Sequence, residues 1–160
     1  MKQKTIFFFI FISLFEVGCS FNGQVLRHEF ADGWKNSEIV ELQFTQNDSV
    51  LSNDLFFVLR HEKSYSFSNI FLISNLKLNG QKPIIDTTEF ILSEPNGKWK
   101  GESRISNVEH ILEFKKNIIL NKDSLNTLTI RNSMRLNNQI SPIENLKNIL
   151  DIGLLIKPAK

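Results

Sequence analysis

The strongest constraint on the fold is an alternation of apolar and polar residues that recurs along much of the chain. Val40, Leu42 and Phe44 alternate with a glutamate and a glutamine, and residues 150–156 repeat the pattern near the C-terminus. A period of two places one kind of side chain on each face of a β-strand. The pattern therefore predicts strands that turn one face to a core and the other to water.

Other segments carry strand signals, and turn residues separate several of them. These segments are 55–59, 70–78, 84–92, 108–114 and 128–130. Asn79-Gly80 predicts a hairpin turn because both residues accept a positive φ, and Pro95-Asn96-Gly97 predicts a second turn. Helical periods are weak, and they predict at most short helices or helical turns over 132–137 and 143–148.

These features predict one all-β domain over residues 24–160. Short strands separated by turn signals are typical of an antiparallel β-sandwich, here expected to be jelly-roll-like. The chain is long enough to bury a substantial core. It has one cysteine, Cys19, so no intramolecular disulfide can form and stability must come from packing.

Residues 1–18 have the features of a bacterial lipoprotein export signal. A basic start precedes an apolar run over 6–15, and Gly18 stands directly before Cys19. The run is shorter than the about 20 residues that span a bilayer. We expect cleavage before Cys19, acylation of that cysteine and a short tether over 19–23. An uncleaved anchor and an ordinary secretory signal remain the alternatives.

Composition and motifs argue against several classes of function. The formal net charge is only +2, without a basic block, so no nucleic-acid partner is expected. The three histidines, His28, His61 and His110, have no partner at helical spacing, so no metal site is predicted. Neither a nucleophile elbow nor a phosphate-binding loop is present in the sequence. We therefore expect a protein that is not an enzyme and needs no cofactor.

Trp99 is a candidate binding residue. It lies between Lys98 and Lys100, just before Gly101, and directly after a predicted turn. An aromatic ring there could be a platform for a sugar or for a partner strand. It could equally cap the edge of the sandwich, with Gly101 allowing a bulge.

Arg60, His61 and Asn69 form a second candidate. Arg60 lies on the opposite face of its strand from Leu59, in an otherwise apolar segment. The three residues could form a polar site. Alternatively, Arg60 buries its stem and bonds through its guanidinium to carbonyls of the 64–69 loop, which is the role we expect.

Several short segments, in order along the chain, match one family pattern. They are Leu59-Arg60-His61, the stretch from Tyr65 through Asn69 to Leu72, and residues 86–89, 95–101, 133–135 and 150–154. The ordered set resembles the GldH gliding-motility lipoproteins of Bacteroidota. This resemblance covers most of the chain after Cys19.

The resemblance implies a lipoprotein that gliding requires. In that phylum gliding depends on an envelope motor tied to type IX secretion, so the implied partners are proteins of this apparatus. Surface-exported lipoproteins of the phylum carry acidic residues after the lipidated cysteine. Here Ser20-Phe21-Asn22 follows Cys19. We therefore expect a membrane-anchored, periplasm-facing protein of the cell envelope.

Two functions from different classes remain. The first is a lipid-anchored protein that supports gliding and type IX secretion through protein contacts. The alternative is a β-sandwich module that binds carbohydrate or peptidoglycan. Exposed coplanar aromatic rings on a concave face would favour sugar, whereas a flat apolar patch or an open strand edge would favour protein.

Overall fold

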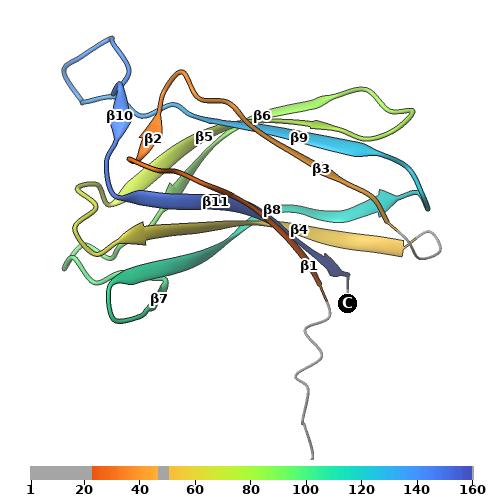
Figure 1. The fold of residues 1–160 in the computed structure, drawn as a ribbon, viewed down its shortest axis with the longest axis horizontal. Helices are drawn as coiled ribbons and strands as arrows, with labels where there is room; N and C mark the ends of the chain where they lie inside the picture. The colour runs from red at the N-terminus through yellow and green to blue at the C-terminus, as the bar shows by residue number, and fades with distance from the viewer. Residues whose placement is uncertain (1–22, 47–50, 160) are drawn as a thin grey trace, which may run out of the picture.

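Two antiparallel β-sheets pack face to face in the computed structural model, which describes residues 23–46 and 51–159 (Figure 1). No helix occurs in those two ranges. The prediction of an all-β sandwich is therefore confirmed.

The first sheet contains five strands in the order β1-β11-β4-β8-β7. Their bounds are β1 Gln24–Glu29, β4 Leu51–Glu62, β7 Glu102–Ser103, β8 Asn107–Leu120 and β11 Ile149–Pro158. β4 and β11 lie in the middle of this sheet. Both carry continuous apolar stretches, and buried side chains lie on both faces of each, such as Leu59 and Val58 on β4.

The second sheet contains four strands in the order β3-β9-β5-β6. Their bounds are β3 Val40–Phe44, β5 Asn69–Lys77, β6 Ile84–Ile91 and β9 Asn126–Asn132. A separate short pair joins β2 (Trp34–Lys35) to β10 (Asn145–Leu146). This pair lies at one end of the sandwich, where the loop after β9 projects (Figure 1).

The core lies between the two sheets and follows the predicted alternation. Leu55, Phe57 and Leu59 point inward from β4, and Leu72 and Leu76 face them from β5, all of them buried. Removing such side chains from water supplies about 25 cal/mol per Å² of apolar surface. The sheet-to-sheet packing therefore takes the place of the disulfides that the chain cannot form.

Both predicted turns are present. Gly80 has φ of 74° in the hairpin that joins β5 to β6, and Gly97 has φ of 85°. In the second turn the amide of Glu94 donates to the carbonyl of Lys98 at 2.8 Å. The positive φ explains the glycine at each position, since other residues adopt it at a cost.

The two predicted helical segments are wrong. After Asn132 the chain buries Met134, forms an isolated bridge from Arg135 to Pro142 and enters a turn, while the second segment contains strand β10 followed by a turn. That turn places Asn148 at φ of 68°, which ends any right-handed helix. Leu146 instead pairs with the fully buried Trp34, so tertiary contacts override a weak helical period.

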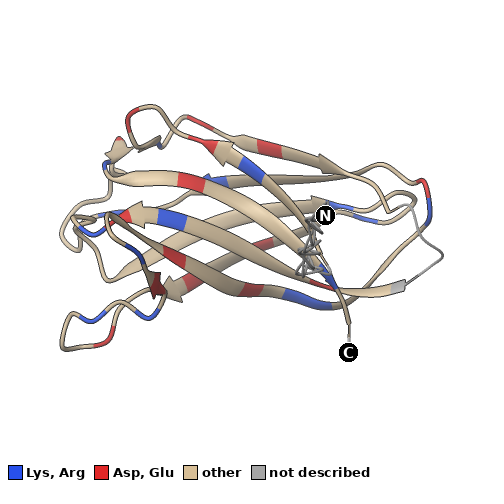
Figure 2. Ribbon diagram, turned by 60° about the horizontal axis from the view of Figure 1, so that its bottom comes forward, with Lys and Arg blue, Asp and Glu red and all other residues tan. Residues whose placement is uncertain are grey.

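Acidic and basic residues are interspersed along the strands of the five-stranded sheet (Figure 2). Several of them are paired across strands, for example Lys115 with Asp86 at 2.8 Å. That ion pair joins β8 of one sheet to β6 of the other. It therefore links the two sheets of the sandwich.

Candidate functional site

Arg60 lies in an ion-pair network on the outer face of the five-stranded sheet, away from the 64–69 loop. Its Nε donates to Asp151 Oδ2 at 2.5 Å, and its Nη2 lies 3.8 Å from Glu29 Oε1. The expectation that the Arg60 guanidinium bonds to carbonyls of the 64–69 loop is therefore wrong. The cause is register: Asp151 on β11 is the residue paired with Arg60 on β4.

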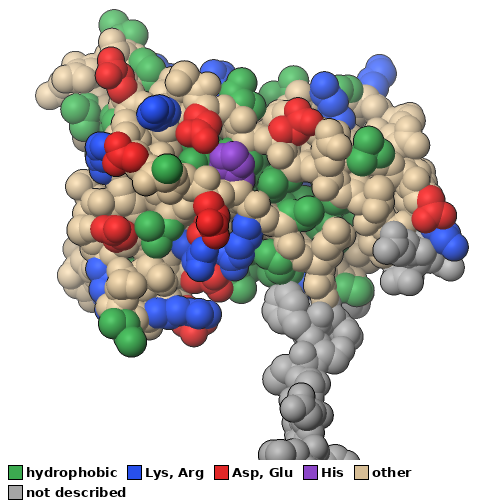
Figure 3. Space-filling view, in the orientation of Figure 1, with side chains coloured by type: hydrophobic (Ala, Val, Ile, Leu, Met, Phe, Trp, Pro, Cys, Tyr) green, Lys and Arg blue, Asp and Glu red, His purple; other side chains and the backbone are tan. Residues whose placement is uncertain are grey.

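Arg27 completes this network from the neighbouring strand β1. Its Nη1 donates to Asp151 Oδ1 at 2.8 Å, and its Nη2 donates to Glu109 Oε2 at 2.8 Å. Asp151 is fully buried, so two arginines compensate one carboxylate removed from water. Figure 3 shows acidic and basic side chains gathered near the middle of the face that β1 crosses.

Gly153 creates the space that Arg27 occupies. A Cβ added at Gly153 would lie 2.3 Å from the carbonyl oxygen of Leu26 and 3.1 Å from Cγ of Arg27. The arginine stem therefore lies across the glycine, its register partner on β11. This explains why a strand in the middle of the sheet contains a glycine.

Tyr65 and Asn69 lie together, apart from Arg60. The buried Tyr65 hydroxyl donates to the carbonyl of Asn69 at 3.2 Å, and Asn69 Nδ2 donates to Glu89 Oε1 at 2.6 Å. Burial raises the pKa of the Tyr65 hydroxyl, so it remains a donor. Tyr65 thus fixes the chain as it enters β5.

Trp99 is half-buried and packs edge-on against His61, with ring centroids 4.5 Å apart. The following Gly101 allows this loop to approach the sheet. A Cβ there would lie 2.4 Å from the carbonyl oxygen of Glu109 and 2.9 Å from the ring of His110. The Trp99 loop therefore covers a pair of histidines.

His61 and His110 form a buried hydrogen-bonded pair that sequence reasoning missed. Their Nε2 atoms are 3.0 Å apart, and His61 Nδ1 lies 2.7 Å from the carbonyl oxygen of Glu62. A carbonyl only accepts, so His61 carries its proton on Nδ1 and His110 donates from Nε2. Burial lowers the pKa of both rings, that of His110 to about 4, and the charge of His61 adds to the effect on His110.

A signal for this pair exists in the sequence. His61 continues the inward phase of Leu59, and His110 lies between the inward residues Val108 and Leu112 on β8. Helical spacing was the wrong criterion for residues on strands, where contacts run between neighbouring strands. The described residues contain no group of three or more side chains able to hold a metal ion.

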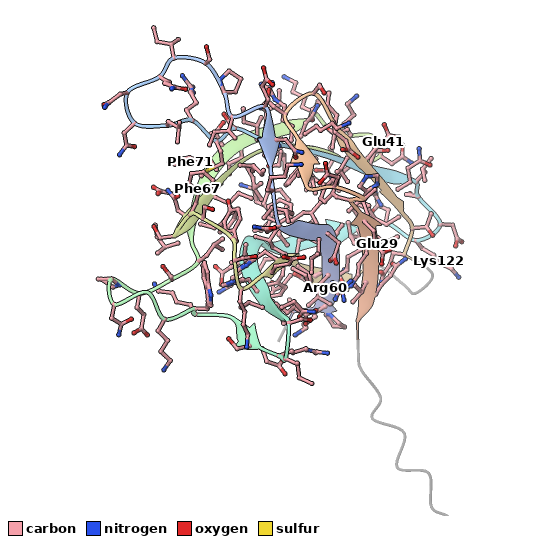
Figure 4. The ribbon with its side chains drawn as sticks, turned by 60° about the vertical axis from the view of Figure 1, so that its left-hand side comes forward. Glu29, Glu41, Arg60, Phe67, Phe71 and Lys122 are labelled. Carbon is pink, nitrogen blue, oxygen red and sulfur yellow. The ribbon has the colours of Figure 1, made fainter. Side chains whose placement is uncertain are left out.

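The structure also contains a groove of about 640 Å³ that the sequence did not predict. It is lined by residues 66–69, by Phe71 and Thr87, and by residues 133–137, and we call it the β5–β9 groove. Phe67 and Phe71 lie next to each other there, below the loop that leads to β10 (Figure 4). Two of the segments on which the family resemblance rests therefore form opposite walls.

The groove opens where β5 and β9 part. Their register ends at Leu72 and Asn132, after which the amide of Ser133 donates to the carbonyl of Phe71 at 2.8 Å. The amide of Phe71 lies 3.3 Å from the sulfur of Met134, a weak acceptor. Beyond this point the two segments diverge, and the space between them is the groove.

The predicted signal and the lipidation residue Cys19 lie outside the described residues. Within the part of the chain that the structure describes, no helix is long and apolar enough to cross a membrane.

Comparisons with known proteins agree on one family. The family model described as GldH lipoprotein matches residues 26–156. A gliding motility lipoprotein GldH homolog of Christiangramia forsetii is 29% identical over 153 residues, which cover 96% of this chain and 94% of the relative. The gliding motility lipoprotein GldH of Flavobacterium johnsoniae is 26% identical over 124 residues, covering 78% of this chain and 77% of the relative.

Among solved structures, one of infectious bursal disease virus matches 85% of this chain and 32% of the viral chain. Its TM-score is 0.29 at 11% identity, which is too low to support a conclusion. The family match covers most of the chain, including both walls of the groove, the histidine pair and the arginine network. The chain belongs to the GldH lipoprotein family.

Proposed function

We propose that this protein is a lipid-anchored component of the cell envelope that supports gliding motility and type IX secretion through non-catalytic contacts with other proteins. The observation that carries the proposal is the family match over residues 26–156, together with relatives named as gliding motility lipoproteins. The gliding role comes from those names. Protein contact is inferred from the surface of the sandwich.

Acylation of Cys19 would hold the domain close to the membrane. β1 begins at Gln24, so only residues 20–23 separate the first strand from the lipid. Two or more acyl chains give stable anchoring. The absence of an acidic run after Cys19 supports a periplasm-facing orientation.

The aromatic residues favour a protein partner over a sugar. Trp34 is fully buried, and Trp99 is half-buried against His61, so neither tryptophan ring is fully exposed. Meanwhile β6 pairs only with β5 among the described residues and exposes Ile85 and Ile91, which are 72% and 50% exposed. An open edge with apolar side chains is a typical feature of a protein-contact surface.

The engagement of the polar groups supports a non-catalytic role. Asp151 is bound by two arginines, and the His61–His110 pair is buried beneath Trp99. A general base or nucleophile must reach a substrate atom. The Asp151 carboxylate is instead bound by its arginines, and the two histidine rings are bound to one another. Their arrangement suits stability and shape.

A gene deletion in a gliding relative tests the proposal. Deletion should abolish spreading on agar and reduce the export of type IX cargo, and the wild-type gene should restore both. Cys19→Ala should fail to complement, whereas Glu94→Gln, a conservative change at an exposed turn, should complement fully. Normal spreading and secretion in the deletion strain would reject the proposal.

A further inference from the structure

We propose that the β5–β9 groove binds an extended, acidic peptide segment of a partner protein, with Arg135 receiving a carboxylate. This deepens the proposed function and rests on it, because it assigns protein contact to one place on the surface. The groove is open to solvent, and its volume of about 640 Å³ suits a short stretch of chain.

Charge is the first reason for choosing an acidic ligand. Arg135 is the only charged residue in the lining of the groove, and it is exposed. No carboxylate pairs with it among the described residues, whereas Arg27 and Arg60 are both bound by acids. A guanidinium binds a carboxylate with two parallel hydrogen bonds, which gives both strength and direction.

Apolar side chains beside Arg135 supply the second part of the chemistry. Leu136 is 45% exposed at the rim, while Phe67 and Phe71 are half-buried and form an aromatic wall. These residues can receive an apolar side chain of the ligand. The ligand should therefore carry an acidic residue close to leucine, isoleucine or phenylalanine.

The remaining lining suits a peptide backbone. Ser68, Thr87 and Ser133 contribute hydroxyl groups, which both donate and accept hydrogen bonds, while the amide nitrogen of Asn69 is held by Glu89. Thr87 belongs to the edge strand β6, so the groove lies beside an open sheet edge. A sugar ligand is less suited to this place, because both tryptophans and the one tyrosine lie outside the lining.

A display library of random short peptides, panned on the full chain in detergent, tests this assignment. Enriched peptides should combine aspartate or glutamate with a large apolar residue. Arg135→Gln should weaken their binding about tenfold or more in fluorescence anisotropy, and Leu136→Ser should also weaken it. In the Arg135→Gln variant, replacing the acidic residue of the peptide by its amide should reduce the binding affinity little further. Both changes remove the same contact between guanidinium and carboxylate.

Lys122→Gln is the charge-matched control. Lys122 lies at the end of the sandwich where β4 begins and β8 ends. The groove lies at the other end, where β4 ends, and Figure 4 shows Lys122 on the opposite side from Phe67 and Phe71. This substitution removes one positive charge far from the groove and should leave peptide binding unchanged. Equal thermal unfolding of the three variants and the wild type would show that each is folded.

Peptide binding that Arg135→Gln leaves unaltered would overturn the assignment, as would a library that yields no binder. Binding of a glycan on an array, lost in Arg135→Gln, would replace the peptide with a sugar. Failure here differs from failure of the proposed function. If only the peptide assignment fails, the wild-type gene still restores spreading in the deletion strain. If the proposed function fails, the deletion strain shows no defect in spreading or secretion.

Discussion

Mild acid should destabilise the domain through the buried pair of His61 and His110. Burial and the charge of His61 lower the pKa of His110 from its ordinary 6.5 to about 4, and burial also lowers the pKa of His61. Unfolding returns both rings to water and to a pKa of about 6.5. As the pH falls, the unfolded chain therefore binds protons first. The contribution of the pair is fully present above about pH 6.5 and is lost as the pH falls toward about 4.

The magnitude follows from the pKa of His110 in the two states. A difference between 6.5 and about 4 corresponds to about 3.4 kcal/mol when fully expressed. Between about pH 7 and about pH 5, His110 alone should reduce the free energy of unfolding by about 2 kcal/mol. His61 adds to this loss in the same direction. The loss is a large share of the about 5–15 kcal/mol that stabilises a typical domain.

Chemical denaturation at a series of pH values, followed by tryptophan fluorescence, measures this effect. His110→Gln should flatten the dependence, because its amide still donates to His61 but does not titrate. His28→Gln is the matched control: it removes one histidine outside the pair and should retain the loss of stability that the His61–His110 pair causes. An unfolding free energy that is constant between about pH 7 and about pH 5 would refute the reasoning, as would an equal loss in His110→Gln.

Three substitutions test the five-stranded sheet. Arg60→Lys should cost about 1–2 kcal/mol in denaturant unfolding, because an ammonium cannot reproduce the planar contact with Asp151; an unchanged midpoint would contradict this. Gly153→Ala should cost about 1–3 kcal/mol, since its Cβ meets the backbone of β1 and displaces Arg27, and a neutral effect would show that β1 moves freely. Leu154→Asp should leave the domain unfolded by circular dichroism, because it buries an unpaired charge; a folded variant would place Leu154 at the surface.

Much of the fold was predictable because its strands are amphipathic. The predicted segments 40–44, 84–92 and 150–156 correspond closely to β3, β6 and β11. Strand β1 was missed, and its sequence explains why. Val25 is an apolar residue at an exposed position, and His28 is a polar residue in phase with the inward Leu26, so the alternation is broken. What fixes β1 is its pairing with β11 and its ion pairs, neither of which a local pattern contains.

The candidate site was less predictable, because its residues meet through register rather than through spacing. Arg60 was correctly assigned to the outer face, yet its partner is Asp151, which is 91 residues away in sequence. The partner of an outward residue depends on which strands are neighbours, and a single sequence does not specify strand order. The same holds for the β5–β9 groove, whose walls are separate segments that only the β5–β9 pairing brings together. Face assignment is a local property and could be predicted, whereas the contacts that define a site on a sandwich are set by topology.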